Sequence, residues 1–179
     1  AIGDKIYNGL KVGDANGSNW SSLTGNISNV SPYCFTAGLD GTTIYAGAFI
    51  KVGGRPYAFK STDGIDFSTF QGGMHSDILT VFGMVTRGDT VYALAQENKA
   101  GVYKTRSYYT TAGASGWTEF GGDLLPSLNT GDRSSLILTP LSMLLGSNEG
   151  LGVFRYDFEE LPEVPDTVDQ IEYPPVATN

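Results

Sequence analysis

The only histidine of the chain, His75, stands directly before Ser76 and Asp77. These three residue types make up a hydrolytic triad, but residues adjacent in sequence rarely reach the required geometry. We therefore expect His75 to lie in a loop between structural units. With one histidine and one cysteine, Cys34, the chain lacks the ligands for a nitrogen- or sulfur-bound metal, and no cofactor is expected. A Ca²⁺ site built from loop Asp and Asn oxygens stays open as an alternative.

Carboxylates are plentiful, with 19 Asp and Glu residues. A two-carboxylate glycosidase needs a pair that faces one cleft, and spacing along the chain does not identify such a pair. Solvated turn positions are the simpler interpretation, so no catalytic residue is assigned and a non-enzymatic protein is favoured. Cys34 has no partner for a disulfide within the chain and is interpreted as a small buried hydrophobe in a strand.

The charge of the chain argues against two classes of partner. The formal net charge is −8, and the eleven Lys and Arg residues are scattered along the sequence. Nucleic acid and anionic membrane surfaces require clustered cations. No apolar run approaches the ~20 residues of a membrane span, and no signal peptide is visible. Because the chain begins with Ala1, we expect a processed chain or a piece of a longer one.

A repeat provides the elements that would position any site. Three segments carry an aromatic residue, an apolar residue three positions later, and then glycine: SNWSSLTGN (18–26), IDFSTFQGG (65–73) and SGWTEFGGD (115–123). The aromatic residues, Trp20, Phe67 and Trp117, are 47 and 50 residues apart. The intervening runs are rich in Val, Ile, Tyr, Phe and Thr and are separated by turn signals. This pattern predicts short strands and no long helix.

We expect an all-β chain with four antiparallel strands per repeat, as in the blades of a β-propeller. The aromatic segment is the fourth strand, and residues 4–12 read as one strand that leads to Trp20. A β-sandwich is the alternative, which the regular spacing disfavours. The other strands are expected at 32–39, 42–48 and 55–61, at 78–85, 89–95 and 100–106, and at 135–141, 142–148 and 151–157.

The turn STDGIDF (61–67) resembles a degenerate Asp-box, the Ser-x-Asp-x-Gly-x-x-Trp motif of sialidase-type (BNR-like) propellers. Ser61 and Asp63 match, Gly64 comes one place early, and Phe67 replaces Trp. GDANGSNW (13–20) is similar, with Asp14 as its acidic residue and one extra residue before the glycine. A third stretch, TIYAGAFIKVGGRPYAF (43–59), resembles repeats of large secreted and phage tail proteins. The resemblance covers roughly residues 4–158.

The resemblance implies a structural role for the motif residues. In such a turn the Asp and Ser side chains bond to the backbone, the glycine takes a positive φ, and the aromatic residue packs between adjacent sheets. The family includes glycosidases, lectins, adhesins and assembly factors. The arginine triad of sialidases is not carried over, because the five arginines fall at unrelated positions of the repeat: Arg55, Arg87, Arg106, Arg133 and Arg155.

The repeat count bears on partners. Propellers close with about four to eight blades, whereas residues 1–160 provide about three to three and a half. We therefore expect completion by other copies of the chain or by a larger parent chain. Residues 161–179 are Pro-rich and acidic, and are expected to form an extended tail or linker, or an arm that lies on a neighbouring subunit.

Two groups of loops are candidate ligand-binding regions. Loops after the second strands and between blades would share one face, and their polar residues suit a carbohydrate or a protein surface. On the opposite face, residues 106–116 are expected to form an exposed aromatic loop with Tyr108 and Tyr109. The candidates on the first face are Lys51, Arg55, Glu97, Asn98, Lys99, Asn148 and Glu149.

These features favour a non-enzymatic structural or recognition module that is extracellular, on a cell surface or on a virion. The alternatives are part of an Asp-box glycoside hydrolase, sialidase- or glucanase-like, and a scaffold or assembly factor. Four glycosylation sequons would carry glycans only in a eukaryotic secretory pathway, and turns rich in Asn and Ser are the simpler reading. They are at Asn16, Asn19, Asn26 and Asn29.

Overall fold

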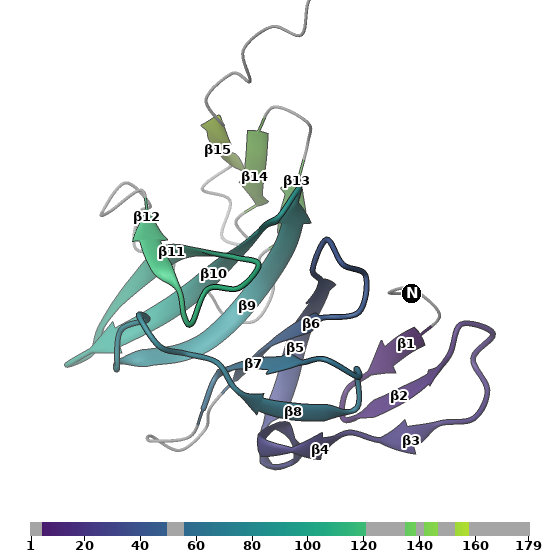
Figure 1. Cartoon of the computed structure of the whole chain (residues 1–179). Helices are drawn as coiled ribbons and strands as arrows, with labels where there is room; N and C mark the ends of the chain where they lie inside the picture. Colours follow the sequence, from purple (N-terminus) through teal and green to yellow (C-terminus); the bar gives the residue numbers. More distant parts are fainter. Residues whose placement is uncertain (1–4, 50–55, 121–134, 139–141, 147–152, 158–179) are drawn as a thin grey trace, which may run out of the picture.

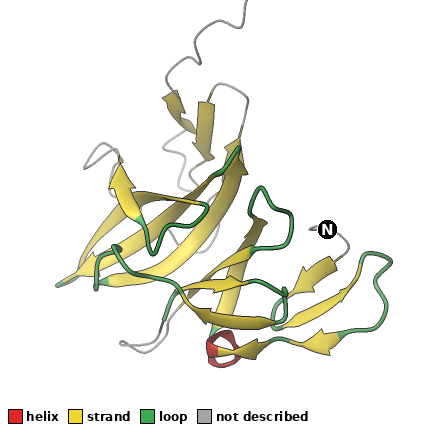
Figure 2. Cartoon of the chain, viewed as in Figure 1, coloured by secondary structure: helices red, strands yellow, loops and turns green. Residues whose placement is uncertain are grey.

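The protein is described here from a computed structural model, which describes residues 5–49, 56–120, 135–138, 142–146 and 153–157. These residues form fifteen strands, and their only helix is one 3-10 turn, η1 (Asn26–Asn29). The predominance of strands is plain in Figure 2. The prediction of an all-β chain is confirmed. No helix among the described residues is long and apolar enough to cross a membrane.

Each of the two central repeats forms a meander, in which every strand pairs antiparallel with the next. The strands begin close to their predicted positions, but β10 and β11 extend beyond their predicted ends. The first meander contains β5 (Ser31–Ala37), β6 (Ile44–Phe49), β7 (Ala58–Ser61) and β8 (Asp66–Thr69). The second contains β9 (Ile78–Arg87), β10 (Thr90–Lys99), β11 (Val102–Thr111) and β12 (Thr118–Phe120).

The N-terminal segment differs from its prediction. The single strand expected over residues 4–12 is wrong, because β1 (Lys5–Asn8) and β2 (Lys11–Asp14) form a hairpin. Gly9, at φ +57°, lies in the connecting turn. β3 (Ser21–Ser22) pairs with β2 to give a three-stranded sheet. β4 (Thr24–Gly25) instead pairs in parallel with β8 of the first meander.

The C-terminal strands form a separate sheet of three antiparallel strands, β13 (Ser135–Leu138), β14 (Ser142–Gly146) and β15 (Val153–Asp157). They correspond to the three strands predicted for the last repeat. The tail at 161–179 lies outside the described residues.

The two meanders meet along their inner strands. β6 and β9 pair at Phe49 and Thr80, which joins both meanders into a nine-stranded sheet with β4. β5 also lies beside β9, where the Oγ1 atoms of Thr36 and Thr86 are 2.9 Å apart. Figure 1 shows the N-terminal hairpin, the first meander and the second meander following one another across the molecule.

The core has two parts, which lie on opposite faces of β6. Because side chains alternate along a strand, Ile44 and Ala46 face one cluster and Tyr45 faces the other. The first cluster packs residues of the N-terminal segment, such as Val12, against the first meander. The second packs the first meander against the second, including Val81. The first meander is therefore covered on both faces.

Candidate functional site

A polar site lies at one end of the β10–β11 hairpin. The strand register pairs Lys99 with Val102 and Glu97 with Lys104. Since alternate residues of a strand share a face, these four side chains and that of Arg106 lie on one face of the hairpin. The two-residue turn is made by Ala100 and Gly101, both at positive φ, which is the conformation of tight hairpin turns.

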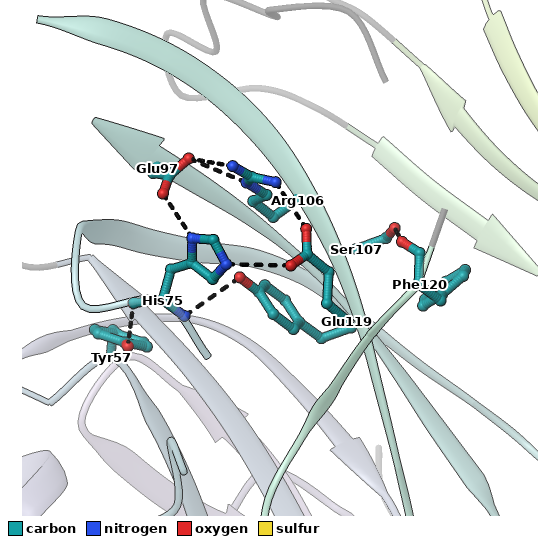
Figure 3. Close-up of polar contacts among 8 residues, drawn as sticks. Tyr57, His75, Glu97, Arg106, Ser107, Glu119 and Phe120 are labelled. Carbon is teal, nitrogen blue, oxygen red and sulfur yellow. Dashed lines mark hydrogen bonds and ion pairs between the residues drawn. The ribbon is translucent and has the colours of Figure 1, made fainter. Parts of the chain in front are cut away.

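Four ionisable side chains form a closed ring on this face. Arg106 donates from Nε (3.0 Å) and Nη2 (2.9 Å) to Oε2 of Glu97, and from Nη1 (2.8 Å) to Oε1 of Glu119. His75 approaches the remaining oxygens, with Nδ1 at 2.9 Å from Oε1 of Glu97 and Nε2 at 3.2 Å from Oε2 of Glu119. Figure 3 shows the imidazole between the two carboxylates, with Arg106 beside both. Each carboxylate thus contacts both Arg106 and His75.

Neighbouring tyrosines fix the loop that carries His75. The hydroxyl of Tyr57 donates to the carbonyl oxygen of His75 at 2.7 Å, and the backbone N–H of His75 donates to the hydroxyl of Tyr108 at 3.4 Å. Burial is the main cause that raises the pKa of both hydroxyls to about 12, so they stay protonated at neutral pH. Tyr57 lies just before β7, so its hydrogen bond ties the loop between the meanders to the first meander. Glu97 and Glu119 tie the same loop to the second meander through His75.

Because the ring is partly buried, the pairing of its charges determines the pKa values of its side chains. The side chain of Glu97 is only 3% exposed. Burial alone raises the pKa of Glu97, but hydrogen bonds from His75 and Arg106, together with the charge of Arg106, outweigh it and lower the pKa below its ordinary 4.5. Burial also disfavours the charged form of Arg106 and on its own would lower the pKa of the guanidinium. The bonds to Glu97 and Glu119 outweigh burial, so the pKa of Arg106 is raised overall. Glu97 is therefore a buried carboxylate that is held ionised by its neighbours.

A cavity of about 270 Å³ lies next to the ring. Lys99, Lys104 and Val102 line it from the hairpin, and the exposed fraction of Val102 is 58%. The ring residues His75, Glu97 and Arg106 also line it. The cavity wall is thus mainly basic, in a chain whose net charge is −8.

The structure brings together only two of the predicted ligand-binding residues, Glu97 and Lys99, at this cavity. The expected loop at 95–101 is wrong over most of its length, because β10 runs to Lys99. Asn98 contributes to the turn, where its Oδ1 accepts from the N–H of Gly101 at 2.9 Å. Lys51, Arg55, Asn148 and Glu149 lie outside the described residues.

The expected exposed loop at 106–116 is also wrong, because residues up to Thr111 belong to β11. Tyr108 is fully buried, so it is not a surface ligand contact. Tyr109 is half-buried and packs edge-on against Phe120, with ring centroids 6.0 Å apart. Alternation along β11 places Tyr108 on the side of the second core cluster, which the sequence pattern alone did not distinguish from exposure.

The turn at 61–66 carries the expected hydrogen bonds. Ser61 Oγ donates to Asp63 Oδ1 at 2.9 Å and accepts from the N–H of Gly64 at 2.9 Å. Asp63 Oδ1 also accepts from the N–H groups of Ile65 (2.8 Å) and Asp66 (2.9 Å). In the earlier turn, Asp14 Oδ2 accepts from the side chain of Asn19 at 2.6 Å. Both acids bond within their own turns.

The three aromatic anchors are not in equal surroundings. Phe67 is buried between the N-terminal segment and the first meander, and Trp117 is buried between the two meanders. Trp117 also donates from Nε1 to the carbonyl oxygen of Phe70 at 2.7 Å. The expectation of a buried anchor is wrong for Trp20, which is 40% exposed. Within the described residues, no repeat precedes Trp20 to cover it.

Sequence reasoning missed most of the ring. The sequence pattern does not single out Arg106 or Glu119 as site residues, and it places His75 only in a loop. The available signal was the alternation of charged residues along Val102–Arg106, which is readable once 95–99 is taken as the partner strand. Among the described residues, no group of three or more His, Cys, Asp and Glu side chains is arranged to hold a metal ion. Here Arg106 lies where a cation between the two carboxylates would lie.

Comparison of the chain with protein-family models, with curated proteins and with solved structures finds no match.

Proposed function

We propose that this chain is a non-enzymatic structural and recognition module of an extracellular or virion-borne protein, built of propeller-type repeats that stack in series. Its exposed terminal repeats associate with further copies of the chain. The observation that carries the proposal is a contact that recurs at both junctions between repeats: the glycine after one aromatic anchor packs against the backbone of the next anchor.

At the first junction, β4 pairs with β8, and Gly25 lies opposite Phe67. A methyl group on Gly25 would lie 2.4 Å from the carbonyl oxygen of Phe67. At the second junction, a methyl group on Gly73 would lie 1.9 Å from the carbonyl oxygen of Trp117. The N–H of Trp117 also donates to the carbonyl oxygen of Gly72 at 2.7 Å. The same type of contact therefore joins successive repeats.

Other contacts between repeats link residues that are about one repeat apart. Cys34 and Val81 are separated by 47 residues, and Thr36 and Thr86 by 50. β5 and β9 lie side by side, and the later strands of the two meanders lead away from them in opposite directions, which supports repeats that follow one another in series.

Trp20 supports association with a further repeat. It is the first anchor, and its exposed fraction of 40% contrasts with 1% for Phe67 and 4% for Trp117. A preceding repeat would cover Trp20 as the N-terminal segment covers Phe67. A second copy of the chain can supply that repeat in a head-to-tail contact, which builds rings or open filaments.

The ionic ring argues against the alternative of a glycoside hydrolase. Such an enzyme needs one carboxylic acid that gives up a proton and a second carboxylate at the opposite side of the substrate. Glu97 and Glu119 instead bind the same guanidinium, and the lowered pKa of Glu97 keeps it ionised near neutral pH. The ring is better suited to holding the inter-repeat loop.

The proposal is tested by light scattering over a range of protein concentrations, combined with fluorescence of the Trp117→Phe variant. The chain has two tryptophans, so this variant leaves Trp20 as the sole indole. We expect a discrete oligomer or filament in which acrylamide quenches Trp20 less than in the dilute monomer. Trp20→Asp should prevent association and leave the monomer folded. A chain that stays monomeric at all concentrations, with Trp20 fully accessible, would contradict the proposal.

A further inference from the structure

The cavity beside the ionic ring has the charge of an anion-binding site. Three cations, Lys99, Lys104 and Arg106, and one anion, Glu97, line it, which gives a net charge of +2 from these four side chains. Glu119, which binds Arg106 from outside the lining, reduces this to +1. The chain as a whole carries −8. A basic cavity in an acidic protein is therefore a local feature of this hairpin.

The carboxylate of Glu97 does not cancel the positive charge of the cavity, because both of its oxygens already contact Arg106 and His75. Glu97 accepts from Arg106 through Oε2 and contacts His75 through Oε1, and its side chain is 3% exposed. Lys99 is exposed at the end of β10, and the side chain of His75 is 42% exposed. Lys99 and Lys104 thus present ammonium donors to the cavity from two strands.

The type of donor favours one anion geometry. A planar carboxylate is matched best by the planar fork of arginine, whereas lysine acts as a point charge with three rotatable donors. The fork of Arg106 is directed at Glu97 and Glu119. The cavity therefore relies on two lysines, which enter from different strands and suit the several oxygens of a tetrahedral group.

We infer that this cavity binds a tetrahedral oxyanion, a sulfate or phosphate ester, carried on a small polar ligand such as a sugar. Lys99 and Lys104 contact the ester oxygens, and the ring of Glu97, Arg106, His75 and Glu119 holds the cavity wall in place. The exposed side chain of Val102 provides an apolar contact for the C–H groups of a sugar ring. The inference rests on the recognition role in the proposed function and assigns that role a place and a ligand chemistry.

Titration calorimetry of the full chain with glucose 6-sulfate, glucose 6-phosphate, glucuronate and glucose tests the inference. We expect either ester to bind at least about tenfold more tightly than glucuronate and glucose, and comparison of the two esters identifies the preferred group. Lys99→Gln should weaken ester binding by about tenfold, the effect of losing one charge-assisted hydrogen bond. Lys104→Gln should do the same, and its unfolding curve shows whether the fold is kept.

Lys11→Gln is the matched control, because Lys11 is an exposed lysine on β2 in the N-terminal hairpin, and the substitution removes the same charge. It should leave ester binding unchanged. Equal weakening by Lys11→Gln and Lys99→Gln would show nonspecific attraction and overturn the inference. Failure of both esters to bind, equal binding of glucose, or tighter binding of glucuronate would also overturn it.

The outcome is separable from that of the association test. Lys99→Gln should associate as the unmodified chain does, because Lys99 lies in the second meander and Trp20 lies in the N-terminal segment. Loss of ester binding with normal association would locate the ligand site and leave the stacking of repeats unaffected. Absence of association with ester binding intact would contradict the head-to-tail contact alone.

Discussion

Gly73 and Trp117 lie so close that any side chain on Gly73 would collide with the Trp117 backbone. A Cβ atom on Gly73 would be 1.9 Å from the carbonyl oxygen of Trp117, and Gly73 has φ +84°. Both conditions require glycine. The contact explains why the repeated phrase ends in glycine: the glycine of one repeat gives space for the aromatic anchor of the next. Gly25 and Phe67 stand in the same relationship.

The two tryptophans should contribute very differently to stability. Trp117→Ala removes a buried ring that packs edge-on against Tyr45 and donates to Phe70, so we expect a loss of about 3–5 kcal/mol in unfolding free energy. Trp20→Ala removes a half-exposed ring and should cost the monomer about 1 kcal/mol or less. Denaturant unfolding of dilute protein measures both. Similar losses in the two variants would contradict the description of Trp20 as an anchor that no neighbouring repeat covers.

Removing the cation of the ring should be strongly destabilising. Arg106→Gln leaves Glu97 buried with only His75 to balance it, and loss of one partner of a buried pair costs about 3–5 kcal/mol. Arg155→Gln is the control, because Arg155 pairs with Asp157 at the surface, where such pairs contribute about 1 kcal/mol or less. Denaturant unfolding compares the two. A loss in Arg106→Gln no larger than in Arg155→Gln would show that the ring does not stabilise the fold.

Acid should weaken the fold through Glu97. The pKa of Glu97 is lower in the folded chain than its ordinary 4.5, so the unfolded chain binds protons more readily. The stabilisation is fully present above pH 4.5 and is lost as the pH falls through the folded pKa. Urea unfolding measured from neutral pH to below 4.5 should show this decline. Glu97→Gln removes the titrating group, so its unfolding free energy should fall less steeply across the same range.

The thiol of Cys34 should be unreactive in the folded chain. Burial, only partly offset by a backbone hydrogen bond at Gly47, raises the pKa of Cys34 to about 12. The nucleophilic thiolate is therefore scarce at neutral pH. We expect labelling with a thiol reagent to be slow in buffer and fast in denaturant. Rapid labelling of the native chain would contradict the close packing of Cys34 against Val81.

The sequence predicted the repeat and its strands because period-2 apolar runs and turn residues are local signals. It does not predict the hairpin at residues 5–14, although a glycine at the first position of a two-residue turn, here Gly9 before Leu10, is a hairpin signal. The run fits a longer strand of the repeat equally well. The sequence also indicated a loop at residues 95–101, since Gln96 and Glu97 are polar. Burial of Glu97 depends on Arg106 and His75, which come from other elements, and spacing along one strand does not reveal such a partnership.

The sequence thus predicts the position of a site residue correctly only where neighbouring residues in the sequence determine that position. Lys99 is a candidate as part of the expected loop at 95–101, and it is exposed at the end of β10. Tyr108 was misplaced because β11 continues through it, and its burial follows from the packing of the second meander on the first. The hydrogen bonds of Ser61 and Asp63 join residues at most three positions apart, so the turn motif was enough to anticipate them.

The stacking of repeats is tested most directly by the unfolding free energies of two matched pairs of glycine variants. Gly73 and Gly113 both have φ +84°, and Gly25 and Gly17 have φ +76° and +77°, but added methyl groups at Gly113 and Gly17 would meet nothing within 4 Å. Each pair therefore shares the backbone strain and differs in the contact with the next anchor. We expect Gly73→Ala and Gly25→Ala to lose about 1–3 kcal/mol more than Gly113→Ala and Gly17→Ala. Equal losses within each pair would contradict the account.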